Sequence, residues 1–173
     1  DPVEYPGMAH FCEHMLFMGT EKYPDVSEFS VLVADGKGER NAYTAPDRTV
    51  YTFSAQEDLF LHLVDRFAHF FIDPLFNASQ VARELHAVDQ EHAKNLEHDG
   101  RRRYMVFKEL GNPHHPHHHF SAGNAKTLAN IPSEALRNWH QKYYGAQQMR
   151  VVLYSSLPLE TLPNLRGEPA RPA

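Results

Sequence analysis

His10-Phe11-Cys12-Glu13-His14 is the stretch that decides how this chain of 173 residues is interpreted. If the stretch is helical, its two histidines lie about 40° apart on one face, at about 100° per residue. Two neutral imidazoles on one face can bind Zn²⁺ at about 2.0–2.1 Å each. Glu13 borders the same face, where it cannot easily bind the metal together with both histidines but can take a proton from water. The stretch therefore predicts a zinc site with a neighbouring general base.

A third ligand is needed to support this prediction, because the chain holds 13 histidines and a pair on a half-buried helix is also an ordinary structural feature. Catalytic zinc sites typically have three protein ligands and one open position. Glu84 and Glu91 are candidates, since seven residues on a helix are nearly two turns and point both carboxylates the same way. Ala87 and Val88 lie between them and indicate an inward face, where a carboxylate needs a partner. A solvated acidic stripe on a surface helix is an equally weighted alternative.

The sequence around the motif resembles the insulinase/pitrilysin family of zinc metallopeptidases, in which H-x-x-E-H marks the inverzincins. The resemblance runs from about Gly7 to Leu157 and is strongest in GMAHFCEHMLFMGTEKYP, residues 7–24. The family's motif is followed, after roughly 76 intervening residues, by a zinc-binding glutamate. Here 76 residues lie between His14 and Glu91. Further stretches resemble the family in the same order: GERNAYT (38–44), 83–95, GNP (111–113) with Pro116, and FSAGN (120–124). Within the family, the continuation FMGT is most similar to the branch of pitrilysin and the insulin-degrading enzymes.

The resemblance implies a role for each residue of the site. His10, His14 and Glu91 are expected to hold one zinc ion per chain and to leave a position for water. Glu13 is expected to take the proton of that water and to deliver it to the leaving amine during peptide hydrolysis. Glu84 is placed as a further carboxylate that orients a ligand or the water. The sequence thus predicts a zinc-dependent endopeptidase domain that acts on peptides or small proteins.

Asn41, Ala42 and Tyr43 form an edge-strand candidate by composition alone. The resemblance implies that the free backbone groups of this strand pair with an extended peptide substrate, which binds as an added strand. It also implies a further partner, because members of this branch are several times longer and have two homologous halves that enclose a chamber. We therefore expect a missing C-terminal half and a missing first strand, and weak or no peptidase activity for this chain alone.

Composition fits a globular enzyme domain and excludes some other classes of protein. The chain is 42% hydrophobic and has a net charge of −5, which favours no nucleic-acid partner. No apolar run approaches 18 residues, so no membrane partner is expected. The single Cys12 cannot form an internal disulfide, and a small buried residue is its favoured role. We expect a soluble protein of the cytoplasm or periplasm, without assigning either compartment.

Patterning predicts an α+β fold in which a mixed or antiparallel sheet is packed with helices on one side. We expect a zinc-peptidase domain over residues 1–157, truncated at both ends, and a frayed, proline-rich tail over 158–173. Strands are expected over 41–45, 49–54 and 149–154. Helices are expected over 9–18, 27–34 (capped by Ser27), 59–71, 79–98 and 133–144, with one or two more turns after Asp99-Gly100.

Two clusters outside the motif have an ordinary and a functional interpretation. The stretch from His114 to His119 holds five histidines and could bind stray transition metal, but a mobile loop is favoured. Arg101-Arg102-Arg103 could contact an acidic partner, but a solvated helix start is favoured. Two alternative functions also stay open. One is a truncated, inactive zinc-binding module that acts only with a partner half, and the other is a histidine-rich metal buffer, against which the ordered motifs argue.

Overall fold

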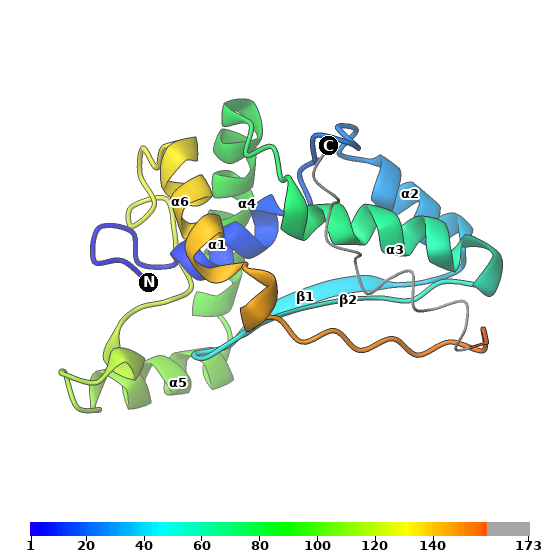
Figure 1. Cartoon of the computed structure of the whole chain (residues 1–173). Coiled ribbons are helices and arrows are strands. Elements are labelled where there is room, and N and C mark those ends of the chain that lie inside the picture. Colours follow the sequence, from blue (N-terminus) through cyan, green and yellow to red (C-terminus); the bar gives the residue numbers. More distant parts are fainter. Residues whose placement is uncertain (159–173) are drawn as a thin grey trace.

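The computed structural model describes residues 1–158, and this part of the chain holds six α-helices and one sheet of two antiparallel strands (Figure 1). Helices α1 and α3 pack against the sheet, and the mixture of helices with a small sheet confirms the expected α+β class. The elements are α1 (Met8–Met15), α2 (Glu28–Asp35), β1 (Arg40–Thr44), β2 (Thr49–Phe53), α3 (Glu57–Ile72), α4 (Ala78–Leu96), α5 (Asp99–Glu109) and α6 (Ser133–Tyr143), with single 3-10 turns at Pro116–His118 and Ala146–Gln148.

Strands β1 and β2 form a hairpin whose alternation sets which side chains reach the core. Arg40 pairs with Phe53 and Thr44 pairs with Thr49 at the two ends of the ladder. Tyr51 and Phe53 face the helices, because successive strand residues point to opposite faces, and their rings contact aromatic side chains of α3. The aromatic stripe of α3 therefore belongs to the core, as its helical spacing predicts.

Helix α1 is the central helix of the domain and carries the H-x-x-E-H motif. Phe11, Cys12, Met15 and Leu16 are fully buried, and α1 contacts α4, α6 and β1. A helix held on three sides in this way has little freedom to rotate or shift. Since truncating a buried phenylalanine to alanine typically costs about 3–5 kcal/mol, the apolar half of the motif stabilises the fold while the polar half stays free for chemistry.

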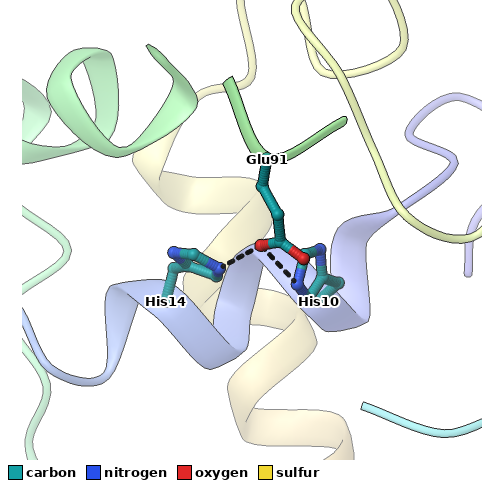
Figure 2. A group of neighbouring side chains, drawn as sticks. All are labelled: His10, His14 and Glu91. Atoms are coloured by element: carbon teal, nitrogen blue, oxygen red, sulfur yellow. Dashed lines mark ion pairs between the residues drawn. The ribbon is translucent and has the colours of Figure 1, made fainter. Parts of the chain in front are cut away.

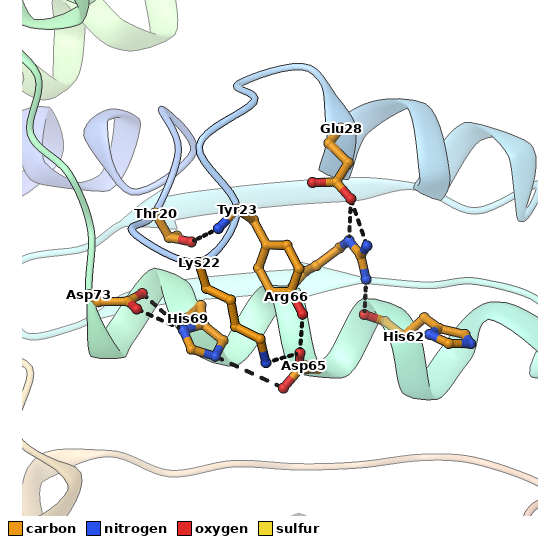
Figure 3. A network of polar contacts seen from close by, with 9 residues as sticks. All are labelled: Thr20, Lys22, Tyr23, Glu28, His62, Asp65, Arg66, His69 and Asp73. Atoms are coloured by element: carbon orange, nitrogen blue, oxygen red, sulfur yellow. Dashed lines mark hydrogen bonds and ion pairs between the residues drawn. The ribbon is translucent and has the colours of Figure 1, made fainter.

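A polar network away from the H-x-x-E-H motif connects the loop before α2, at Lys22 and Tyr23, with α3 (Figure 3). The ammonium of Lys22 lies 2.7 Å from a carboxylate oxygen of Asp65, and the hydroxyl of Tyr23 donates to the same carboxylate. Arg66 contacts Glu28 through two nitrogens, at 2.6 and 2.9 Å. None of these side chains lines the cleft described below, so the network serves the packing of α2 and α3.

Four expectations about secondary structure were wrong. Helix α1 ends at Met15, ahead of Gly19, and α5 continues for 11 residues because Gly100 lies inside its first turn and does not end it. Residues 149–154 are not a strand, since no ladder partner pairs with them among residues 1–158, and Val152 and Tyr154 are almost fully exposed. Ser27 precedes α2, but its hydroxyl donates to Asp25 and makes no cap.

The expected tail over 158–173 lies, except for its first residue, outside the described residues. Within residues 1–158, no helix is both long enough and apolar enough to cross a membrane.

Candidate metal centre

Two histidines of α1 and one glutamate of α4 converge at one point, as Figure 2 shows. The Nε2 atoms of His10 and His14 each lie 3.6 Å from Oε2 of Glu91. A tetrahedral zinc with bonds of about 2.0–2.1 Å separates its ligand atoms by roughly 3.3 Å. The separations found here are therefore close to those that a zinc ion requires. They bring together the three residues that the sequence predicts as ligands.

A carboxylate on α4 holds the far side of the His14 ring. Oε2 of Glu84 lies 3.4 Å from Nδ1 of His14, and the Glu84 side chain is buried. With Nδ1 donating to Glu84, the Nε2 atom is the one free to face Glu91 and a metal. Val88 is buried between the two glutamates as expected, whereas Ala87 is exposed and lines the cleft. The acidic face of α4 is thus turned toward α1.

A backbone carbonyl orients the second imidazole. Nδ1 of His10 donates to the carbonyl oxygen of Ala122 at 2.6 Å, which leaves its Nε2 directed at Glu91. The loop that carries this carbonyl is held by a contact between two glycines, both with positive φ. A Cβ on Gly7 would lie 2.3 Å from Cα of Gly123, so only glycine allows this approach. Both imidazoles are therefore oriented by fixed partners.

The charges at this centre are strongly coupled. Burial works to lower the pKa of His14, but contacts with Glu84 and Glu91 outweigh burial and raise that pKa to about 9. The same contact with His14 lowers the pKa of Glu91 to about 2 and also lowers the pKa of Glu84. Both carboxylates are therefore ionised near neutral pH, and together with Glu13 they create a demand for positive charge at this point.

Glu13 lies beside the metal ligands and belongs to the same helix. Its side chain is buried, and burial raises the pKa of its carboxyl group. The hydroxyl of Thr44, the last residue of β1, donates a hydrogen bond to Oε2 of Glu13. A carboxylate with a raised pKa and a fixed orientation is suited to take a proton and to give it up again.

The centre opens into a cleft of about 1250 Å³ that β1 borders along its length. Asn41, Ala42 and Tyr43 all line it, and the ring of Tyr43 is half exposed. The N–H of Ala42 donates to the side chain of Asn41, so it points away from the ladder with β2. This outward N–H is held by a side chain, and no other strand of residues 1–158 pairs with it, so an extended chain in the cleft could replace the contact with Asn41.

Within residues 1–158, His10, His14 and Glu91 are the group of side chains best suited to bind a zinc ion. Two imidazole nitrogens and one carboxylate oxygen are a common donor set of catalytic zinc sites, and this is the one group of three converging ligands found in that range. The histidines of 114–119 converge on no such point. Cys12 is fully buried, and burial raises its pKa to about 12, so it is not a thiolate ligand.

Two contacts of the site are not evident from the sequence. The carbonyl of Ala122 is a backbone group, and no residue type marks it as a partner of His10. Thr44 lies within the strand expected over 41–45, directly after the substrate-binding candidates, and its position at the end of β1, beside α1, is the one signal that could have indicated it.

Comparison with known proteins gives a consistent result across sequence and structure. Residues 1–114 match the family described as "Insulinase (Peptidase family M16)". The chain is 40% identical over 172 residues to the insulin-degrading enzyme of Homo sapiens, covering 95% of this chain and 17% of that protein. It is 41% identical over 169 residues to the A-factor-processing enzyme of Saccharomyces cerevisiae, covering 94% and 16%. A relative in Schizosaccharomyces pombe, 42% identical over 175 residues, is named provisionally as a zinc protease.

The fold comparison agrees with the sequence comparison. The crystal structure of pitrilysin matches with a TM-score of 0.90 and 38% identity, covering 95% of this chain and 18% of that one. The chain therefore spans less than a fifth of the length of the relatives it matches. With a matching family model over residues 1–114 and the converging ligands of α1 and α4, the chain belongs to the insulinase family of peptidases, family M16.

Proposed function

We propose that this chain is the zinc-binding part of a metalloendopeptidase and that it hydrolyses bonds within peptides or small proteins. The observation that carries the proposal is the placement of Glu13 beside the converging atoms of His10, His14 and Glu91. Three ligands hold a metal, and a fourth side chain, buried and hydrogen-bonded, is left over for proton transfer. Family membership and the relative named as a zinc protease support the choice of zinc.

The residues of the site divide the work between binding and proton transfer. His10, His14 and Glu91 would hold the zinc, which when bound supplies Lewis acidity that polarises a peptide carbonyl and acidifies water. Glu13 accepts a proton from the attacking water at its carboxylate and returns it to the nitrogen of the leaving amine. Burial raises the pKa of Glu13, which favours the protonated form that this role needs. Glu84 keeps the His14 ring oriented throughout.

The peptide would lie extended along β1. The available edge at Ala42 supports pairing by strand addition, with Asn41 and Tyr43 beside the bound chain. Thr44 lies at the end of the same strand and donates a hydrogen bond to Glu13 of α1, so this bond ties the strand edge to the general base. A scissile bond held against β1 is thereby kept in register with the carboxylate that moves the proton.

A second candidate function is a zinc-binding module that needs a partner half for turnover. The observations that favour it are the short span of the chain relative to its relatives and a wide, open cleft. Under this proposal the chain supplies metal and general base, and a homologous half supplies the opposing wall that excludes water. Both candidates use the same residues, and they differ in whether the chain alone turns over peptide.

Replacing Glu13 with glutamine tests the proposal, because Gln keeps the size and polarity of the side chain but cannot take a proton. We expect Glu13→Gln to bind one zinc per chain and to lose peptidase activity by at least ~10²-fold. Activity is measured on the chain alone and after addition of a homologous C-terminal half, which separates the two candidates.

The matched control is Glu97→Gln, an exposed glutamate at the end of α4, which should keep both zinc and activity. His14→Ala should lose the tight zinc in elemental analysis. Unchanged activity of Glu13→Gln under conditions in which the original chain is active would refute the role of Glu13.

A further inference from the structure

A lysine is buried in a wall of the cleft that holds the converging residues, and it also borders the larger groove beside β2. Lys108 is only 4% exposed, and it is the one buried residue of α5, the helix that forms this wall of the cleft. Its ammonium donates to the hydroxyl of Ser121 at 3.1 Å and lies 5.8 Å from the centre of the Tyr104 ring. Both are neutral partners. Among residues 1–158, no carboxylate lies within 4.0 Å of this ammonium, and burial alone lowers the pKa of Lys108.

This arrangement is unusual because a buried ammonium is normally paired with a carboxylate. Removing a charge from water costs several kcal/mol unless an opposite charge compensates it. Ser121 satisfies one of the three N–H groups of the ammonium and supplies no charge. The amine therefore keeps donors and an uncompensated charge at the surface of the cleft.

The cleft face of α5 carries one sign of charge. Arg101, Tyr104 and Lys108 follow one another at helical spacing and all line the cleft. The carboxylates of α5, Asp99 and Glu109, are not among the lining residues. The acidic side chains of the cleft lie on α1 and α4: the two of α4 contact the histidines of the metal centre, and Glu13 of α1 accepts a hydrogen bond from Thr44. A ligand that extends from the metal centre toward α5 thus meets unpaired positive charge.

We propose that Lys108 is a substrate-binding residue that pairs with a carboxylate of the peptide in the cleft. This inference rests on the proposed peptidase function and names one contact that selects among its substrates. The carboxylate is either the C-terminal group of the peptide or an aspartate or glutamate side chain, since both present the same two oxygens to an ammonium. Peptides that carry such a group next to α5 are preferred over neutral ones.

Lys108 also has a structural interpretation, because Ser121 precedes the residue whose carbonyl holds His10. In that case the amine would do no more than fasten the loop of Ser121. The two roles differ in a measurable way. If Lys108 only fastens the loop, removing it weakens zinc binding and the binding of all peptides alike. If Lys108 contacts a substrate carboxylate, removing it weakens the binding of acidic peptides only.

The test measures peptide binding to the zinc-loaded chain in a Glu13→Gln background, which prevents cleavage. Three labelled peptides of one sequence are compared by fluorescence anisotropy: a free C-terminal acid with an internal glutamate, its C-terminal amide, and the acid with that glutamate changed to glutamine. We expect one of the two neutralised peptides to bind more weakly than the first. Which of them does so identifies the source of the carboxylate.

Lys108→Met should weaken the binding of the preferred peptide about 10-fold or more, as expected for a charge-assisted hydrogen bond. Its binding of the neutralised peptide should change less than about twofold. Lys108→Arg should keep most of the preference, and Lys126→Met, at an exposed lysine outside the cleft, should change nothing. Ser121→Ala removes the internal partner and should leave the preference for the carboxylate intact.

Several outcomes would overturn the proposal. They are an equal loss for all peptides in Lys108→Met, an effect of Ser121→Ala that copies it, no preference for any carboxylate, or no peptide binding at all. Zinc stoichiometry is measured on the same samples. Loss of zinc from the original chain would refute the proposed function, whereas zinc-loaded chain that binds all peptides equally would refute only the role of Lys108.

Discussion

At the scale of single residues, the site is governed by His14, which has a carboxylate at each ring nitrogen. Glu84 lies at Nδ1 and Glu91 at Nε2, and these contacts raise the pKa of His14 to about 9. A metal binds only the unprotonated Nε2. Protons and zinc therefore compete for one atom over the whole physiological range of pH.

This competition predicts a steep dependence of zinc affinity on pH. Below about pH 9 the His14 proton must leave before zinc binds, so the apparent affinity should rise about tenfold per pH unit up to that value. Competition with a chromophoric chelator between pH 6 and 10 measures this. Glu84→Gln removes one cause of the raised pKa and should shift the plateau to lower pH, whereas Glu97→Gln should leave it unchanged. A flat affinity between pH 6 and 9 would contradict the prediction.

The convergence of His10, His14 and Glu91 could be predicted from the sequence, and the partners that orient the two imidazoles only in part. Residues four apart on a helix must share a face, which placed His10 and His14, and a spacing typical of the family placed Glu91. The carboxylate of Glu84 followed from its register with Glu91 on one helix. A backbone carbonyl has no such signature, because every residue carries one. The contact of Ala122 with His10 was therefore invisible before the loop was placed in space.

At the scale of elements, α1 owes its position to contacts on both of its faces. Its apolar face is buried in the core, and its first residues meet the loop of residues 120–124 at the contact of Gly7 with Gly123. That loop also presents the carbonyl that orients His10. The start of the metal helix and the alignment of one ligand thus depend on the same close approach of two backbones.

Adding one methyl group at this contact should damage the fold and the metal site together. Gly7 has a φ of 100°, and a Cβ there would lie 2.3 Å from Cα of Gly123. We expect Gly7→Ala to lose at least about 2 kcal/mol of unfolding free energy and to bind zinc more weakly, because the carbonyl of Ala122 must move. Thermal unfolding and zinc titration measure the two effects.

Gly100→Ala is the matched control for this substitution. Gly100 lies in the first turn of α5, and a Cβ there would meet only the side chain of His98, at 3.1 Å. This variant should be neutral or slightly more stable, because alanine favours the helix. Equal stability of the two variants would show that the contact of Gly7 with Gly123 is not tight in solution.

Other elements show what pattern alone leaves undecided. The apolar run at 149–154 has the composition of a strand, but a strand exists only when another backbone pairs with it, and none does so in the described residues. The length of α5 was underestimated because Asp99-Gly100 reads as a break. In the structure, Asp99 instead opens the helix and Gly100 lies inside its first turn.

At the scale of the whole molecule, a large groove separates β2 from the extended segment 149–156. Its volume is about 1990 Å³, which exceeds that of the metal cleft, and apolar side chains of α3 form much of its lining. It holds no set of converging metal ligands. Exposed apolar surface of this extent is usually covered by another part of a protein or by another molecule.

The groove predicts that the isolated chain associates with itself. Val152 and Tyr154 are 90% and 97% exposed at its rim. Changing both to aspartate should increase the monomeric fraction seen by light scattering after size exclusion, at concentrations on the order of tens of micromolar. Leu110→Asp removes an exposed leucine outside the groove and should have a much smaller effect. A monomeric original chain at these concentrations would contradict this reading of the groove.

The pair of carboxylates around His14 also has a consequence for the supply of metal. When zinc departs, a proton returns to the imidazole and restores positive charge between Glu84 and Glu91. The positive charge of the protonated imidazole offsets the repulsion between the two carboxylates, so the pocket keeps its shape without a metal ion. Helix α1 is held by its buried face, so its two histidines stay positioned to bind another ion. We therefore expect a metal ion to leave and to bind again without unfolding of the chain.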